Sequence, residues 1–192
     1  AESLRNIGVE VTEFDIGDLR LEALLPFPTL VVGIRAFNVH KDLAFKNQIL
    51  WDYVKQGGTV IVQYNTSRGF DPSIMAPYPL QLSRDRVTDE HAEVRFLNKE
   101  HPLLNEPNKI TSEDFEGWVQ ERGLYFANRW DEKFEPLFSI NDKGESQKMG
   151  SLLVTDYGQG KFTFTGLSFF RELPAGVPGA YRLFANLISY GQ

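Results

Sequence analysis

The sequence predicts an α/β fold, in which a mostly parallel sheet is flanked by helices and extended by β-hairpins. Two short apolar runs rich in β-branched residues, 29–34 and 59–63, are typical of buried parallel strands. Between them, residues 41–56 change to helical spacing, with apolar side chains every three or four positions. Strand, helix and strand in this order predict a right-handed crossover that places the two strands parallel.

The elements before this crossover follow from local patterns. Residues 1–7 are typical of the end of a helix, which Gly8 terminates. Residues 9–15 alternate apolar and polar side chains, as a half-buried strand does. We expect the 29–34 strand to lie in the centre of the sheet, covered on both faces.

The predicted crossover helix has one apolar stripe. Phe45, Ile49 and Tyr53 recur at four-residue spacing along 41–56. Gly57-Gly58 is a typical end for this helix.

The second half of the chain is predicted to be mainly β. Three prolines favour a long loop over 70–82, and 112–116 is typical of a helical turn capped by Ser112. Strands are predicted over 92–97, 124–127, 136–140, 151–155 and 161–165. Gly158-Gln-Gly160 predicts a hairpin turn between the last two, and a final helix is expected to begin near Pro178.

Composition excludes several classes of function. The net charge of -6 argues against a nucleic-acid-binding surface, and no apolar run has the length of a membrane span. With no cysteine, disulfides and thiolate metal sites are excluded, and the three histidines lack the spacing of metal ligands. We therefore expect no metal and no cofactor, and partners that are small molecules or other proteins.

One segment resembles a known active-site motif. Gly166-Leu-Ser-Phe-Phe-Arg-Glu172 is similar to the Gly-Val-Gln-Phe-His-Pro-Glu run of class I glutamine amidotransferases, where the His activates a cysteine and the Glu orients the His. Here Phe170 stands at the His position and Glu172 at the Glu position. Without a thiol or a base, the resemblance implies a scaffold that has lost its chemistry, with no catalytic residue.

The same resemblance implies a flavodoxin-like, doubly wound sheet for the chain. It predicts a single domain over 1–192, a piece of a larger protein that lacks the family's usual first strand.

Two further segments, 114–126 and 167–181, resemble the region that follows the deacetylase in bacterial PIG-L (LmbE-like) proteins. Those enzymes are zinc-dependent N-deacetylases of sugar conjugates. Their His-Pro-Asp-Asp motif is absent here, because His101-Pro102 is followed by two leucines. The resemblance implies a bacterial protein, cytoplasmic or periplasmic, with an N-terminal deacetylase domain in the same polypeptide as a partner.

The candidate site lies at the carboxyl ends of the parallel strands, where such sheets bind ligands. The resemblance places the family's nucleophile elbow at 64–66, at the start of a helix. The residues expected to surround a vestigial ligand site are Arg35, Asn38, Gln63, Tyr64, Asn65, Trp118, Arg171 and Glu172.

Each of these residues also has a structural interpretation. Residues 63–67 can satisfy loop backbone groups instead of contacting a ligand, and Trp118 can pack in the core instead of stacking on a sugar. A buried Glu172 needs a partner, for which Arg35 or Arg171 is expected.

The sequence thus favours a non-catalytic amidotransferase-like accessory domain that binds a ligand, such as a sugar conjugate, or docks to a deacetylase. Two alternatives stay open: a hydrolase that uses Glu172 with a hydroxyl or water at the same edge, and a purely structural domain. An open pocket at this edge favours binding or catalysis, whereas a filled edge favours structure alone.

Overall fold

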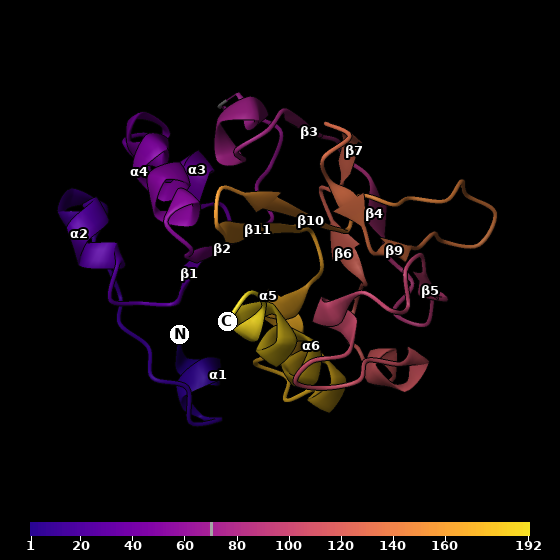
Figure 1. Cartoon of the computed structure of the whole chain (residues 1–192). Coiled ribbons are helices and arrows are strands. Elements are labelled where there is room, and N and C mark those ends of the chain that lie inside the picture. The colour runs from indigo at the N-terminus through magenta and orange to yellow at the C-terminus, as the bar shows by residue number, and fades with distance from the viewer. Residues whose placement is uncertain (70) are drawn as a thin grey trace.

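The structure, a computed structural model, describes residues 1–69 and 71–192 (Figure 1). A five-stranded sheet has the order β1-β2-β11-β10-β8. The three parallel strands are β1 (Thr29–Val32), β2 (Thr59–Gln63) and β11 (Gly160–Thr165). Antiparallel strands β10 (Leu152–Tyr157) and β8 (Glu135–Pro136) extend the sheet beyond β11. The predicted α/β class and the β1–β2 crossover are confirmed.

The crossover helix α4 (Leu43–Lys55) packs against β2 and β11. Leu43, Leu50 and Val54 face the core, whereas the Phe45 side of the helix faces away and that residue is 86% exposed. The predicted stripe is therefore wrong at Phe45, because this residue lies two positions from Leu43 and points to the opposite side. The helix ends as predicted at Gly57, whose φ of +103° is left-handed.

Strand β1 lies at the edge of the sheet, not at its centre as predicted. Three of its four residues are only half-buried. A segment outside the sheet covers the free side of β1. This strand is therefore mostly apolar, as a buried strand is.

That segment is the one predicted as a strand over 9–15, which forms no strand. It runs from α1 (Glu2–Arg5) to the 3₁₀ turn η1 (Ile16–Asp18) and α2 (Leu21–Leu24), beside β1 (Figure 1). Val9 and Val11 pack against the core on one face of the sheet, and Phe14 against the core on the other. The alternating pattern therefore reflects a strap that passes from one core to the other.

Two hydrophobic cores lie on opposite faces of the sheet. The core on one face includes α4, and the core on the other includes α6 (Pro178–Ser189). Helix α6 begins at the predicted proline and buries Ala180, Phe184 and Leu187. Within the described chain, no helix is long and apolar enough to span a bilayer.

The rest of the chain forms short antiparallel pairs at one end of the sheet. They are β3 (Leu80–Leu82) with β7 (Ala127–Trp130), β4 (Arg86–Val87) with β6 (Gly123–Leu124), and β5 (Arg95–Phe96) with β9 (Phe138–Ser139). Three 3₁₀ turns accompany them: η2 (Pro72–Met75), η3 (Pro102–Leu104) and η4 (Ser112–Phe115).

These pairs revise several predicted elements. The 70–82 loop contains η2 and β3, and Phe70 itself lies outside the described residues. The 92–97 strand shortens to β5, and Thr111 instead of Ser112 is the N-cap of η4. The β10–β11 hairpin is confirmed, since Tyr157 pairs with Gly160 across the predicted turn.

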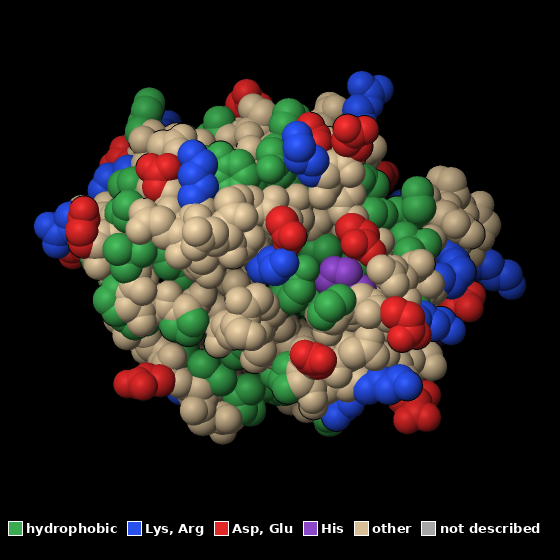
Figure 2. Space-filling model, in the orientation of Figure 1, with side chains coloured by type: hydrophobic (Ala, Val, Ile, Leu, Met, Phe, Trp, Pro, Cys, Tyr) green, Lys and Arg blue, Asp and Glu red, His purple; other side chains and the backbone are tan. Residues whose placement is uncertain are grey.

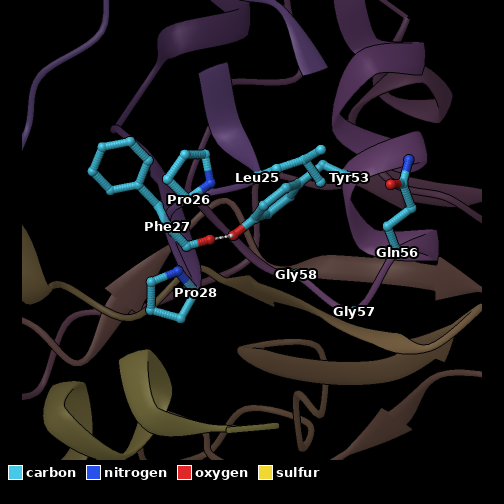
Figure 3. A pocket seen from close by; sticks show the side chains of 8 residues that line it. All are labelled: Leu25, Pro26, Phe27, Pro28, Tyr53, Gln56, Gly57 and Gly58. Carbon is cyan, nitrogen blue, oxygen red and sulfur yellow. Dashed lines mark hydrogen bonds between the residues drawn. The ribbon is translucent and has the colours of Figure 1, made fainter. Parts of the chain in front are cut away.

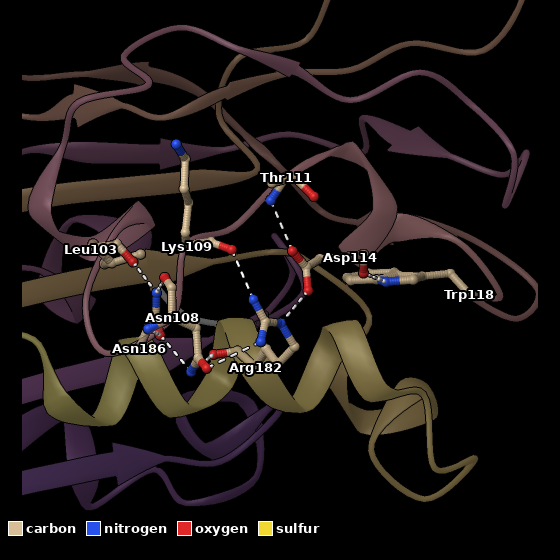
Figure 4. Close-up of polar contacts among 8 residues, drawn as sticks. All are labelled: Leu103, Asn108, Lys109, Thr111, Asp114, Trp118, Arg182 and Asn186. Atoms are coloured by element: carbon tan, nitrogen blue, oxygen red, sulfur yellow. Dashed lines mark hydrogen bonds and ion pairs between the residues drawn. The ribbon is translucent and has the colours of Figure 1, made fainter.

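Polar contacts hold the η3–η4 loop on α6 (Figure 4). The Arg182 Nε donates to Asp114 Oδ1 over 2.7 Å, and the fully buried Asn186 donates to the Leu103 carbonyl over 2.8 Å. Gly179 lies against the same loop, because a Cβ there would be 1.9 Å from the Asp114 carbonyl oxygen. These contacts hold the loop against α6.

Candidate functional site

Three loops meet at the carboxyl edge of the parallel strands. The loop after β1 leads into the short helix α3 (Ala36–Val39), and the loop after β11 leads into α5 (Phe169–Glu172). The Arg35 N–H donates to the Tyr64 carbonyl over 2.8 Å, which joins the loop after β1 to the loop after β2. The Asn38 side chain accepts from the Thr66 N–H over 2.8 Å and fixes the same junction. The predicted residues from the first two loops are thus brought together.

Asn65 is a structural residue at the position expected for the nucleophile. Its side chain is fully buried; Oδ1 accepts from the Phe37 N–H over 3.0 Å, and Nδ2 donates to the Gln63 carbonyl over 3.0 Å. No helix begins here in the described chain, since the next helical element is η2, at Pro72. The predicted nucleophile elbow at a helix N-terminus is therefore wrong. The Asn65 side chain instead satisfies hydrogen-bonding groups of the loop backbone.

Aromatic rings fill the position expected for the base. The Tyr64 and Phe170 ring centroids are 5.1 Å apart, and Tyr125 stacks on Tyr64 with centroids 6.0 Å apart and planes 8° apart. Tyr64 is only 8% exposed. Burial raises the pKa of its phenol, while the charges of Arg35 and Arg171 act in the opposite direction. This edge therefore places two guanidinium groups near a phenol that stays protonated.

Glu172 is buried and hydrogen-bonded, but not to either predicted arginine. Its Oε2 accepts from the Val119 N–H over 2.9 Å, and its Oε1 from Ser168 Oγ over 3.1 Å. The expected pairing of Glu172 with Arg35 or Arg171 is wrong, and Arg171 forms an ion pair with another carboxylate. Burial raises the pKa of Glu172, against the hydrogen bonds from Val119 and Ser168.

That other carboxylate is Glu121, which sequence reasoning missed. Its Oε1 accepts from Arg171 Nε over 3.0 Å, and its Oε2 from Arg86 Nη2 over 2.8 Å. The Glu121 side chain is only 3% exposed, so this clamp fixes Arg171 at the edge with its guanidinium 4.9 Å from the Phe170 ring centroid. Nothing in the local sequence around Glu121 distinguishes it from a solvated acid.

Trp118 is a core residue, which decides between its two interpretations. It is 3% exposed, and its Nε1–H donates to the Asp114 carbonyl over 2.9 Å (Figure 4). Its ring packs near Phe115 and Phe169. Stacking on a sugar is therefore excluded for this side chain in this structure.

Strained backbone gathers around the same edge. In the described residues, three that are not glycine have a left-handed φ: Arg35 at 55°, Gln120 at 67° and Tyr125 at 53°. Arg35 contacts the Tyr64 backbone, Tyr125 stacks on the Tyr64 ring, and Gln120 adjoins the Glu121 clamp. Such strain concentrates at functional sites, where surrounding contacts hold it. No Gly or Asn marks these three positions in the sequence.

Two surface hollows lie away from this edge. One, of about 270 Å³, lies between the 25–28 loop and the Gly57-Gly58 turn (Figure 3). The Tyr53 hydroxyl there donates to the Phe27 carbonyl over 2.7 Å, and all the lining residues are uncharged. The other hollow is lined by His101 and by acidic, basic and uncharged residues. In the described chain no group of three His, Cys, Asp or Glu side chains is placed to hold a metal.

Comparison with known proteins identifies the fold. No known family profile and no curated protein matches the sequence. Among solved structures, cytoplasmic protein STM1381 from Salmonella typhimurium LT2 is 14% identical with a TM-score of 0.66, covering 100% of this chain and 85% of its own. Cytoplasmic protein STM3548 from Salmonella typhimurium is 16% identical with a TM-score of 0.64, covering 98% and 84%. The fold is shared with these proteins.

A third similar structure is a cold-adapted β-galactosidase from Rahnella sp. R3. It is 13% identical, with a TM-score of 0.57 over 98% of this chain. The match covers only 26% of the β-galactosidase chain, so there this fold is one part of a larger enzyme.

Proposed function

We propose that this chain is a non-catalytic class I glutamine amidotransferase-like domain that binds an anionic sugar conjugate next to a PIG-L-type N-deacetylase. The observation that carries the proposal is the meeting of Arg35, Tyr64 and Arg171 at an edge without the cysteine and histidine of the resembled motif. Guanidinium groups grip carboxylates and phosphates through paired N–H donors, and aromatic rings contact the apolar faces of sugars.

Two features support a binding role over catalysis. The fully buried Glu172 has both oxygens engaged by Val119 and Ser168, so it is not available to activate a water for the alternative hydrolase. Arg35, by contrast, is exposed, and a strained backbone conformation positions it. The filled aromatic edge also agrees with the purely structural alternative, and the binding experiment below separates the two.

The similarity to part of a β-galactosidase supports the accessory role. In that enzyme, which is named for a sugar substrate, the matched region is about a quarter of the chain. A region of this fold is therefore one part of an enzyme named for a carbohydrate substrate, in line with the arrangement proposed here.

Glucose 6-phosphate and glucose test the proposal as a matched pair. We expect the phosphate to shift backbone amide NMR signals of the Arg35 and Tyr64 loops, and glucose to bind more weakly. Arg35→Ala and Arg171→Ala should each weaken binding of the phosphate about 10-fold, the loss of one charge-assisted contact. Arg84→Ala, an exposed control, should not. No shift with either sugar at millimolar concentration would favour the structural alternative.

A glutaminase assay tests the loss of chemistry. The chain is expected to show no turnover, and so is the double variant Asn65→Cys with Phe170→His. Restoring a thiol and a ring does not restore the helix N-terminus that would stabilise a thiolate after β2. Turnover by the double variant would show that side chains alone were missing.

A further inference from the structure

A second hollow lies at the opposite edge of the same sheet. It has a volume of about 430 Å³ and is lined by residues from η3, β8, β10, β11 and the end of α6. Figure 2 shows a histidine among acidic and basic side chains, and the lining of this hollow contains residues of the same three kinds. Its size is within the range of small-molecule sites, about 300–1,000 Å³. Titratable groups from four segments that are distant in sequence line this hollow.

His101 presents a fixed donor to this hollow. Its Nδ1 accepts from the Leu103 N–H over 3.2 Å, so the neutral ring carries its proton on Nε2. That Nε2 lies 3.4 Å from Tyr190 Oη and 4.0 Å from Glu135 Oε2, both at the long limit of a contact. The residue is 7% exposed, and burial lowers the pKa of its ring from the ordinary 6.5, which favours the neutral form. The donor is therefore buried, oriented and only weakly used.

Two carboxylates give the hollow its charge. Glu135 Oε1 accepts from Asn98 over 2.6 Å, and Asp156 Oδ1 pairs with Lys161 Nζ over 2.6 Å. The second oxygen of each carboxylate has no hydrogen-bond donor among the described residues. Lys133, which also lines the hollow, lies 3.8 Å from Asp131 outside it. The lining thus holds two lysines and two carboxylates, but Glu135 has no lysine partner among the described residues.

The electrostatics of Tyr190 show that both carboxylates act on the hollow. Burial raises the pKa of the Tyr190 phenol to about 12, and the charges of Asp156 and Glu135 act in the same direction. A positively charged group entering the hollow would therefore be attracted to the two carboxylates.

The side chains of the hollow do not form a metal-binding set. Of the described residues, no three His, Cys, Asp or Glu side chains lie close enough together to ligate one. An organic ammonium group fits better, since its three N–H donors suit the second oxygens of Glu135 and Asp156, which have no donor among the described residues. His101 and Tyr190 add hydrogen-bonding groups suited to hydroxyls, above a floor formed by the buried Val154.

We propose that this hollow is a binding site for a small hydroxylated primary amine, with its ammonium group between Glu135 and Asp156 and its hydroxyls on His101 and Tyr190. The site is independent of the proposed anion site, because it uses other residues at the other edge of the sheet.

Three sugars that differ at one position test this inference. Glucosamine carries the ammonium group, N-acetylglucosamine carries it acylated, and glucose replaces it by a hydroxyl. Titrations at pH 7, followed by the NMR signals of the His101 ring, are expected to show saturable binding of glucosamine. The other two sugars should bind at least about 10-fold more weakly, because a hydrogen bond between charged groups is lost. Equal affinity for glucosamine and N-acetylglucosamine, or no response of His101 to glucosamine, would overturn the inference.

Matched variants locate the ammonium group. Glu135→Gln and Asp156→Asn keep size and hydrogen bonding, remove one charge each, and should each weaken glucosamine binding about 10-fold. Glu132→Gln, an exposed change three residues away in the same strand connection, should leave it unchanged. If Glu135→Gln proves unstable, the loss of glucosamine affinity in Asp156→Asn tests the same inference. Equal losses in all three variants would indicate bulk charge attraction and contradict a site.

The two sites can fail separately. Arg35→Ala should leave glucosamine binding intact, and Glu135→Gln should leave glucose 6-phosphate binding intact. Loss of both ligands in a variant whose amide NMR spectrum shows that it is folded would contradict two independent sites.

Discussion

The two edges of the central sheet both carry charged residues, yet they use them in opposite ways. At the carboxyl edge, Glu172 and Asn65 have no exposed surface, and their polar atoms bond to neighbouring loops. At the amino edge of β11, the Glu135 and Asp156 side chains are 45% and 70% exposed, and each has one oxygen without a protein donor in the described chain.

The difference shows that polar groups at the carboxyl edge of the parallel strands are part of the scaffold. The Phe170 ring packs on Tyr64, and the buried polar groups nearby bond to the loops around them. Residues that resemble a catalytic motif then contribute stability, whereas residues outside any motif keep free hydrogen-bonding capacity. The comparison predicts that polar substitutions destabilise the carboxyl edge and hardly affect the stability of the amino edge.

Glu172→Ala should have the largest effect. The substitution removes the acceptor of the Val119 N–H and leaves a cavity among buried groups. We expect a loss of about 3 kcal/mol in the free energy of unfolding, measured by urea denaturation. Glu172→Gln, which keeps an acceptor, is the control and should lose less. An unchanged value for the alanine variant would mean that this edge is not part of the scaffold.

Asn65→Ala should have an intermediate effect. It removes the hydrogen bonds to Phe37 N–H and the Gln63 carbonyl, for an expected loss of about 1–2 kcal/mol. The same denaturation experiment measures it, with Asn128→Ala as a control on the exposed face of β7. A loss no greater than that of the control would contradict the structural role of Asn65.

The pH dependence of Glu172 gives a sharper test. Because burial raises its pKa above the ordinary 4.5, the folded state binds the proton more tightly than the unfolded state. Ionised Glu172 therefore costs stability at neutral pH, and that cost disappears as pH falls through the raised pKa toward 4.5. The stability of the wild type relative to Glu172→Gln should thus improve with falling pH. A difference that is independent of pH would show that the pKa is not raised.

The smallest effect is expected at the amino edge. Glu135→Gln and Asp156→Asn should each change the unfolding free energy by less than about 0.5 kcal/mol, because the groups are partly or largely exposed. Thermal and urea unfolding measure this directly. A loss as large as that of Asn65→Ala would remove the contrast between the two edges.

Much of the fold was predictable because the signals are local. The runs at 29–34 and 59–63, the helix between them and the Gly158–Gly160 turn each carry their own pattern, and the structure confirms them. The strap over 9–15 was not predictable, since alternation has the same appearance whether residues face one sheet or two separate cores.

The candidate site was predictable in position but not in contacts. Strand order alone brings the loops carrying Arg35, Asn65 and Glu172 to one edge. Which carboxylate holds Arg171 depends on Glu121, which reaches the edge from another segment. The hollow at His101 was missed for the same reason, because its lining residues come from segments with no common motif.

The pairing of β2 with β11 has a consequence for how the chain reaches this fold. Thr59 lies beside Lys161, roughly a hundred residues later, so the middle of the sheet joins segments from distant parts of the chain. During synthesis, β1, α4 and β2 emerge early and wait for the β10–β11 hairpin with one side of β2 unpaired. Until that hairpin leaves the ribosome, the apolar strand β2 is open to pairing with other chains. The order of the strands along the chain therefore makes completion of the sheet a late and slow step of folding.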